Sequence, residues 1–79
     1  MPNPLLLDRL RERLILVDPS LPADIPAGSK FTEWELDSLD LVEFVARLEQ
    51  DFGLMIADED LPQLISLEAT ATYLEARLS

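Results

Sequence analysis

The sequence predicts an all-α fold, a small bundle of three longer helices and one short helix. Three stretches repeat apolar residues at helical spacing, and each begins at a residue that can cap a helix. The 79 residues suffice for a single domain, residues 1–79, with one modest core. A proline-rich segment, residues 18–36, is predicted to be a long loop between the first two helices.

The first longer helix is predicted to run from about Pro4 to Val17. Asn3 is a suitable N-cap, and proline is favoured at the first helical position. The helix ends at the Asp18-Pro19 pair, because the residue before a proline disfavours helical angles. Its expected core positions are Leu7, Leu10, Leu14 and Val17.

The loop of residues 18–36 contains three prolines and a glycine, which exclude a long helix or a central strand. A loop of this length inside a compact domain needs apolar anchors of its own. The candidate anchors are Leu21, Ile25, Phe31, Trp34 and Leu36. We interpret the two aromatic residues among them as core side chains rather than as ligand-binding groups.

The second longer helix is predicted to begin after Asp37, whose carboxylate can accept the free N–H groups of the first turn. Asp40 occupies the third helical position, where a second carboxylate completes a capping box. The hydroxyl of Ser38 is then not needed for capping and should be exposed. A phosphate group is favoured at such a helix start. On its own, however, this pattern is also typical of an ordinary start of a helix.

The second helix, from Ser38 to about Phe52, presents three surfaces when its residues are placed 100° apart. The expected core face consists of Leu41, Phe44, Val45, Leu48 and Phe52. The expected solvent face consists of Asp40, Glu43, Arg47, Gln50 and Asp51. A second apolar strip consists of Leu39, Val42 and Ala46, bordered by Ser38, Glu43 and Glu49. This strip could dock basic proteins or pack beneath the loop of residues 18–36, and the residues alone do not favour either alternative.

The remaining chain is predicted to form a short helix and a final longer helix. Asp58, Glu59 and Asp60 open the short helix, which Pro62 limits to one or two turns. The acidic cluster does not fit a calcium-binding loop, since Ile56 replaces the required glycine, and no metal site is expected. Leu61 and Leu64 should face inward, Ser66 should cap the final helix, and its core positions should be Leu67, Ala71, Leu74 and Leu78.

The composition restricts the possible functions. The chain has no cysteine and no histidine, which excludes a disulfide framework, the commonest general base and the commonest zinc ligand, so an enzyme is not expected. Sixteen acidic and six basic side chains give a formal net charge of −10, which disfavours nucleic acid and favours basic protein partners. Apolar runs are too short for membrane insertion, and a cytoplasmic monomer is expected.

The motif around Ser38 and the segments after it resemble the acyl carrier proteins. The matching segments are Asp37-Ser38-Leu39-Asp40, Val42-Glu43, Leu48-Glu49, Phe52, Ile56-Ala57-Asp58-Glu59, Ser66-Leu67-Glu68-Ala69 and Tyr73-Leu74. The resemblance extends from about Asp37 to the C-terminus, which is over half the chain, with a compatible helix before it. The resemblance implies a small four-helix carrier-protein bundle in which Ser38, preceded by Asp37, bears 4′-phosphopantetheine through a phosphodiester. The protein would thus be a phosphoprotein.

The resemblance implies an acyl carrier that tethers thioesters for enzymes of fatty-acid, lipid or polyketide-type synthesis. Its partners would be a phosphopantetheinyl transferase and acyl-loading and acyl-processing enzymes with basic docking surfaces. The resemblance to the acyl carrier proteins also favours docking as the role of the apolar strip. The expected partner surface consists of Leu39, Asp40, Val42, Glu43, Ala46, Glu49 and Asp58.

Two alternatives remain at this stage. One is a peptidyl or aminoacyl carrier with the same fold, and the other is an unmodified acidic helical adaptor.

The sequence also departs from the family, which has a leucine-glycine pair where this chain has Trp34-Glu35. Because glutamate lacks the conformational freedom of glycine, we expect a different loop path, with Glu35 in solvent, and a dedicated carrier for a specialised pathway.

Overall fold

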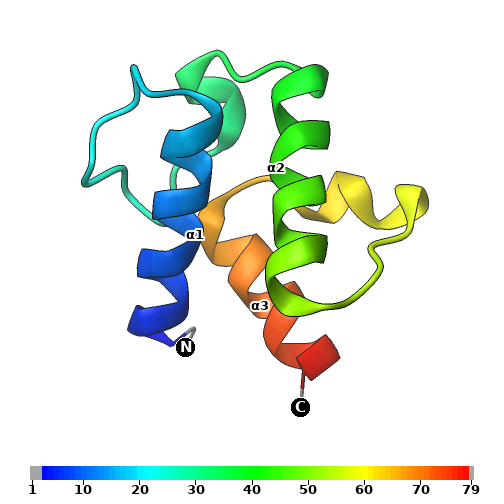
Figure 1. Ribbon diagram of the computed structural model, residues 1–79. Helices are drawn as coiled ribbons and strands as arrows, with labels where there is room; N and C mark the ends of the chain where they lie inside the picture. Colours follow the sequence, from blue (N-terminus) through cyan, green and yellow to red (C-terminus); the bar gives the residue numbers. More distant parts are fainter. Residues whose placement is uncertain (1–2, 79) are drawn as a thin grey trace.

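The computed structural model describes residues 3–78, which form three α-helices and two short 3₁₀ helices, with no β-strand among those residues (Figure 1). The α-helices are α1 (Pro4–Val17), α2 (Ser38–Phe52) and α3 (Leu67–Leu78). The 3₁₀ helices are η1 (Phe31–Trp34) and η2 (Asp58–Gln63). The predicted all-α bundle with a long loop between the first two longer helices is confirmed, and η1 adds a turn inside that loop.

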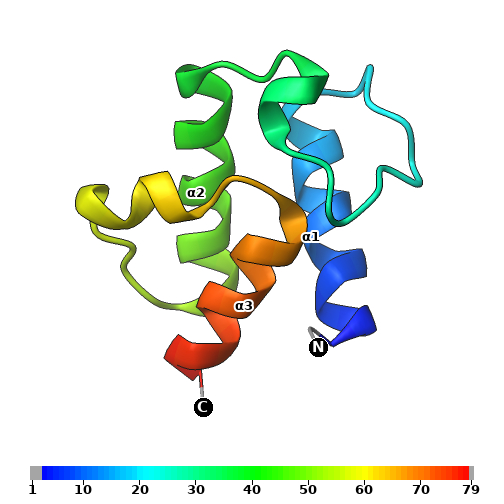
Figure 2. The same cartoon turned by 180° about the vertical axis from the view of Figure 1, so that it is seen from behind.

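The three α-helices pack around one core, with η2 on the far side of α2 from α1 (Figures 1 and 2). The start of α1 and the end of α3 lie at one end of the bundle, and the start of α2 lies at the opposite end. Gly53 ends α2 with a left-handed backbone (φ 65°), as the sequence predicts. The start of α2 is therefore presented at a free end of the molecule.

The core contains apolar side chains from every helix except η2 and from the long loop. Its buried members are Leu10, Leu14, Leu21, Ile25, Phe31, Leu36, Phe44, Val45, Leu48, Ile56, Leu64, Leu67, Ala71 and Leu74. The predicted core positions Leu7, Val17, Trp34, Leu41, Phe52 and Leu61 are partly buried against this cluster. The prediction for Leu78 is wrong, because this side chain lies at the last residue of α3 and stays half exposed.

The long loop is fixed by core contacts and by backbone hydrogen bonds. Ile25 is fully buried, and Phe31 packs edge-to-face on Phe44 with 5.8 Å between the ring centroids. The N–H of Phe31 donates to the carbonyl of Ile65 (2.8 Å), and the N–H of Glu68 donates to the carbonyl of Ala27 (2.9 Å). The loop is therefore anchored to the start of α3, and the interpretation of Phe31 as a core side chain is confirmed.

The prediction that Asp51 faces solvent is wrong, because this side chain lies between α2 and α1. Its two carboxylate oxygens accept hydrogen bonds from Arg9 (2.9 Å) and Arg13 (3.1 Å), and its side chain is only 18% exposed. With 100° between successive residues, Asp51 falls beside Phe44 at the border of the core face, and the arginines of α1 approach this side of α2. The hydrogen bond from Arg13, helped by the two positive charges, lowers the pKa of Asp51 although burial acts in the opposite direction.

We expect Asp51→Asn to lower the free energy of unfolding by about 1 kcal/mol at pH 7, because two partly exposed ion pairs are lost. The folded carboxyl has a pKa below its unfolded value of about 3.9, so the stabilisation is present above that value. It should disappear as the pH falls through the lower folded pKa. Urea unfolding at several pH values measures the difference between the two proteins.

Asp8→Asn is the matched control, since Asp8 is 66% exposed and pairs with Arg11 within the same helix at 3.1 Å. Asp8→Asn should lower the free energy of unfolding by only a few tenths of a kcal/mol, because an exposed ion pair within one helix contributes little. Equal losses from the two substitutions would contradict the role given to Asp51 between the helices.

Candidate functional site

The start of α2 is held by two aspartates. Oδ1 of Asp37 accepts the N–H of Asp40 at 2.9 Å, and Oδ2 of Asp40 accepts the N–H of Asp37 at 3.2 Å. This reciprocal pair is the predicted capping box. Capping therefore does not require the hydroxyl of Ser38.

Ser38 is exposed at the first position of α2, and its hydroxyl makes no hydrogen bond within residues 3–78. The amide N–H groups of Ser38 and Leu39 also have no acceptor in that part of the chain. Two free amide donors at the positive end of a helix suit the oxygens of a phosphodiester. The local geometry thus fits a phosphate-linked group on the Ser38 oxygen.

Ser38 also lies at the edge of an apolar hollow between α2 and η2 with a volume of about 310 Å³. Its walls are formed mainly by aliphatic side chains, with Asp58 at the edge. The lining residues are Ser38, Leu41, Val42, Phe44, Val45, Asp58, Leu61, Pro62 and Leu64. A flexible group attached to Ser38 could therefore place an apolar end out of water without leaving the protein.

The apolar strip on α2 is exposed. Leu39 is 77% and Val42 55% accessible, and Ala46 is also exposed. The strip therefore does not pack beneath the loop of residues 18–36. Of the two predicted roles for this strip, the docking of partner proteins therefore remains, and a row of exposed apolar side chains beside Ser38 is suited to it.

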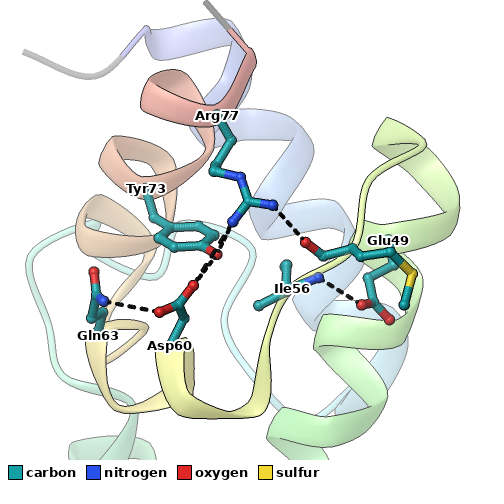
Figure 3. Close-up of polar contacts among 7 residues, drawn as sticks. Glu49, Ile56, Asp60, Gln63, Tyr73 and Arg77 are labelled. Atoms are coloured by element: carbon teal, nitrogen blue, oxygen red, sulfur yellow. Dashed lines mark hydrogen bonds and ion pairs between the residues drawn. The ribbon is translucent and has the colours of Figure 1, made fainter.

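The acidic residues expected around the strip have different roles in the structure. Asp58 is exposed, while Asp40 belongs to the capping box. Glu43 is exposed and pairs with Arg47 one turn further along α2, at 3.2 Å. Glu49 is partly buried and accepts the N–H of Ile56 at 2.8 Å (Figure 3), so its carboxylate holds the chain after α2 instead of facing a partner.

Sequence reasoning did not identify a polar cluster that joins η2 to α3. It consists of Asp60, Tyr73 and Arg77 (Figure 3). The hydroxyl of Tyr73 donates a hydrogen bond to Asp60, and this bond raises the pKa of Tyr73. The spacing of four between Tyr73 and Arg77 places both on one face of α3, but nothing in the sequence indicates that Asp60 reaches them.

Glu35 stands next to this site with an unusual backbone. Its φ of 60° and ψ of 28° lie in the left-handed region, which non-glycine residues adopt at a cost. Its side chain is exposed, as expected, and Trp34 is partly buried against the core. Glu35 thus adopts the backbone angles that glycine favours, which removes the reason given for a different loop path. The path relative to the acyl carrier proteins that the sequence resembles stays a prediction.

We expect Glu35→Gly to raise the free energy of unfolding by about 0.5–1 kcal/mol, since glycine removes the left-handed strain but loses more chain entropy. Thermal unfolding followed by circular dichroism measures this change. Glu35→Ala removes the same charge and keeps the Cβ atom, so it should give no such gain. Equal gains from both variants would assign the effect to charge and not to the backbone.

No helix in residues 3–78 is long and apolar enough to cross a membrane. Within the same range, no group of three or more acidic side chains is arranged to hold a metal ion.

Two comparisons with known proteins identify the family to which this chain is similar. A protein family described as "Phosphopantetheine attachment site" matches residues 6–74. Acyl carrier protein 5, chloroplastic, from Arabidopsis thaliana is 41% identical over 51 residues, which make up 65% of this chain and 37% of that protein. The matched region therefore spans little more than a third of that relative.

Proposed function

This chain belongs to the acyl carrier proteins, which bear a covalently attached 4′-phosphopantetheine, and we propose that Ser38 is the attachment residue. The observation that carries the proposal is the exposed, unpaired hydroxyl of Ser38 at the start of a helix capped by Asp37. The free N–H groups of Ser38 and Leu39 would bind the phosphodiester oxygens.

We further propose that residues 1–79 act as a single carrier domain that performs no chemistry itself. The arm supplies a thiol that holds an acyl group as a thioester. The chain supplies the hydroxyl that anchors the arm, the apolar hollow beside it and the surface that partners bind. Tethering raises the effective concentration of the acyl group at each partner enzyme.

The proposed partners are a phosphopantetheinyl transferase and enzymes of fatty-acid, lipid or polyketide-type synthesis that load or process acyl groups. The exposed strip of Leu39, Val42 and Ala46 would contact them, with Asp40, Glu43 and Asp58 attracting basic side chains. A cytoplasmic location stays a prediction, because the Arabidopsis thaliana relative is named as chloroplastic.

A peptidyl or aminoacyl cargo is the alternative for the same site. The acidic residue Asp40 after Ser38-Leu39 and the net charge of −10 favour an acyl cargo. The Glu43–Arg47 pair places a positive charge beside the proposed surface, which supports a carrier dedicated to its own partners.

Intact-protein mass spectrometry tests the function directly. After incubation with coenzyme A and a phosphopantetheinyl transferase, the wild-type chain should gain the mass of one arm. A chain that gains no mass would instead be an unmodified adaptor. The mass of protein purified from its own cell would then identify the cargo as acyl or aminoacyl.

A further inference from the structure

The 3₁₀ helix η2 has no buried residue of its own. The chain is buried on either side of it, at Ile56 (6% exposed) and Leu64 (3% exposed). A segment with few buried apolar contacts opens at low cost in free energy unless polar contacts hold it. The side chains that attach η2 and the residues before it to the bundle therefore decide how firmly it is held.

Three side chains of α2 and α3 hold this segment (Figure 3). The hydroxyl of Tyr73 donates to Oδ2 of Asp60 at 2.6 Å. Arg77 donates from Nη1 to the Tyr73 oxygen (2.6 Å) and from Nη2 to the carbonyl of Met55 (2.9 Å). Its guanidinium also lies 3.8 Å from the Asp60 carboxylate. With the Glu49 contact to Ile56, these bonds fix the chain before and within η2.

The same segment separates two apolar hollows. The first, of about 310 Å³, reaches Ser38, and the second, of about 280 Å³, extends towards η1 and Ile65. Both hollows are lined by Leu41, Leu61, Pro62 and Leu64. Leu61 and Pro62 belong to η2, so this helix forms part of the wall between them. Each hollow alone is near the lower end of the roughly 300–1,000 Å³ found for small-molecule sites.

We propose that the cluster of Asp60, Tyr73 and Arg77 keeps η2 in place as this wall, so that the carrier shelters short acyl groups in the first hollow and long ones only after the cluster opens. A long chain entering beside Ser38 would have to displace Leu61 and Pro62 to reach the second hollow. The inference rests on the proposed attachment at Ser38. It makes the three polar residues positioning residues that set the length of the sheltered cargo.

Hydrogen exchange of the unloaded protein tests the first step. The double variant Tyr73→Phe/Arg77→Gln keeps the aromatic ring but removes the hydrogen bond from Tyr73 to Asp60 and the contacts of the Arg77 guanidinium with Tyr73, Asp60 and Met55. The amide of Asp60, bonded to the carbonyl of Ala57, and that of Leu64, bonded to the carbonyl of Leu61, should exchange about tenfold faster. Amides in the middle of α1 and α2 should not change.

Arg9→Gln is the matched control, because it removes an arginine ion pair with Asp51 on the other side of α2. It should leave the exchange of the Asp60 and Leu64 amides unchanged. Unchanged exchange at these amides in the double variant would overturn the proposal. So would an equal increase in Arg9→Gln, because the effect would then be general loss of stability.

Loading the arm tests the second step. In the wild type, a hexanoyl group should leave exchange in η2 unchanged, whereas a hexadecanoyl group should increase it. In the double variant, the hexadecanoyl thioester should become several-fold more resistant to hydroxylamine, while the hexanoyl thioester should react as in the wild type. Equal effects of the two chain lengths would overturn the proposal.

A protein that accepts no arm gives a distinct result. It would refute the proposed function, and the inference about cargo length would fall with it. Exchange of the unloaded protein would still show whether the cluster holds η2. The failure of the function and the failure of the wall are therefore distinguishable.

Discussion

Ser38→Ala is expected to abolish the gain in mass on incubation with coenzyme A and a phosphopantetheinyl transferase. The substitution removes the only atom at this position that can form the phosphoester bond. The fold should be unaffected, because Asp37 and Asp40 supply the capping bonds at the start of α2. Intact mass and circular dichroism measure the two parts of this prediction.

Ser29→Ala is the matched control, since it removes a serine hydroxyl from the long loop. It should gain the full mass of the arm. If Ser38→Ala still gains that mass, the attachment residue is another hydroxyl, such as Ser29 or Ser66. If Ser38→Ala unfolds, the serine has a structural role at the helix start that the observed capping bonds do not explain.

Local signals in the sequence predict the helices and the capped, exposed start of α2 well. Asn3 and Asp37 accept the N–H groups expected of N-caps, and the observed bounds of α1 and α2 agree with those predicted. Ser66 likewise caps α3, its hydroxyl oxygen accepting the N–H of Ala69 at 3.0 Å. Each of these features depends on residues within three or four positions, which is why the sequence alone can predict them.

Contacts between elements could not be predicted in the same way. Asp51 is predicted to face solvent and Glu49 to border the docking strip, yet Asp51 binds α1 and Glu49 binds the chain after Gly53. Asp60 reaches Tyr73 only because the chain turns back along α3 after η2. Such partners depend on how the elements are placed in space, which the periodicity of one helix does not contain.

The ion pairs also explain why the start of α2 stays acidic. Each arginine of the chain pairs with a carboxylate of the chain, three from α1 and one each from α2 and α3. These pairs involve neither the capping aspartates nor Asp58. Negative charge therefore remains beside Ser38, where it can speed the approach of basic partners.

Val42→Asp is expected to slow the transferase-catalysed modification of Ser38 at least about tenfold while the protein stays folded, because a charge then lies in the centre of the proposed docking strip. Val42 is 55% exposed, so the free energy of unfolding should change by no more than about 0.5 kcal/mol. Modification rates at low substrate concentration and urea unfolding measure these effects.

Gln50→Asp adds the same charge at an exposed position of α2 outside the strip, and it should leave the modification rate nearly unchanged. Long-range repulsion from a partner would slow both variants and would weaken as salt is added, whereas a lost apolar contact should affect Val42→Asp alone and persist at high salt. Equal rates for Val42→Asp and the wild type would place the partner surface elsewhere on the bundle. Unfolding of Val42→Asp would instead show that this side chain supports the apolar hollow it lines beside Ser38.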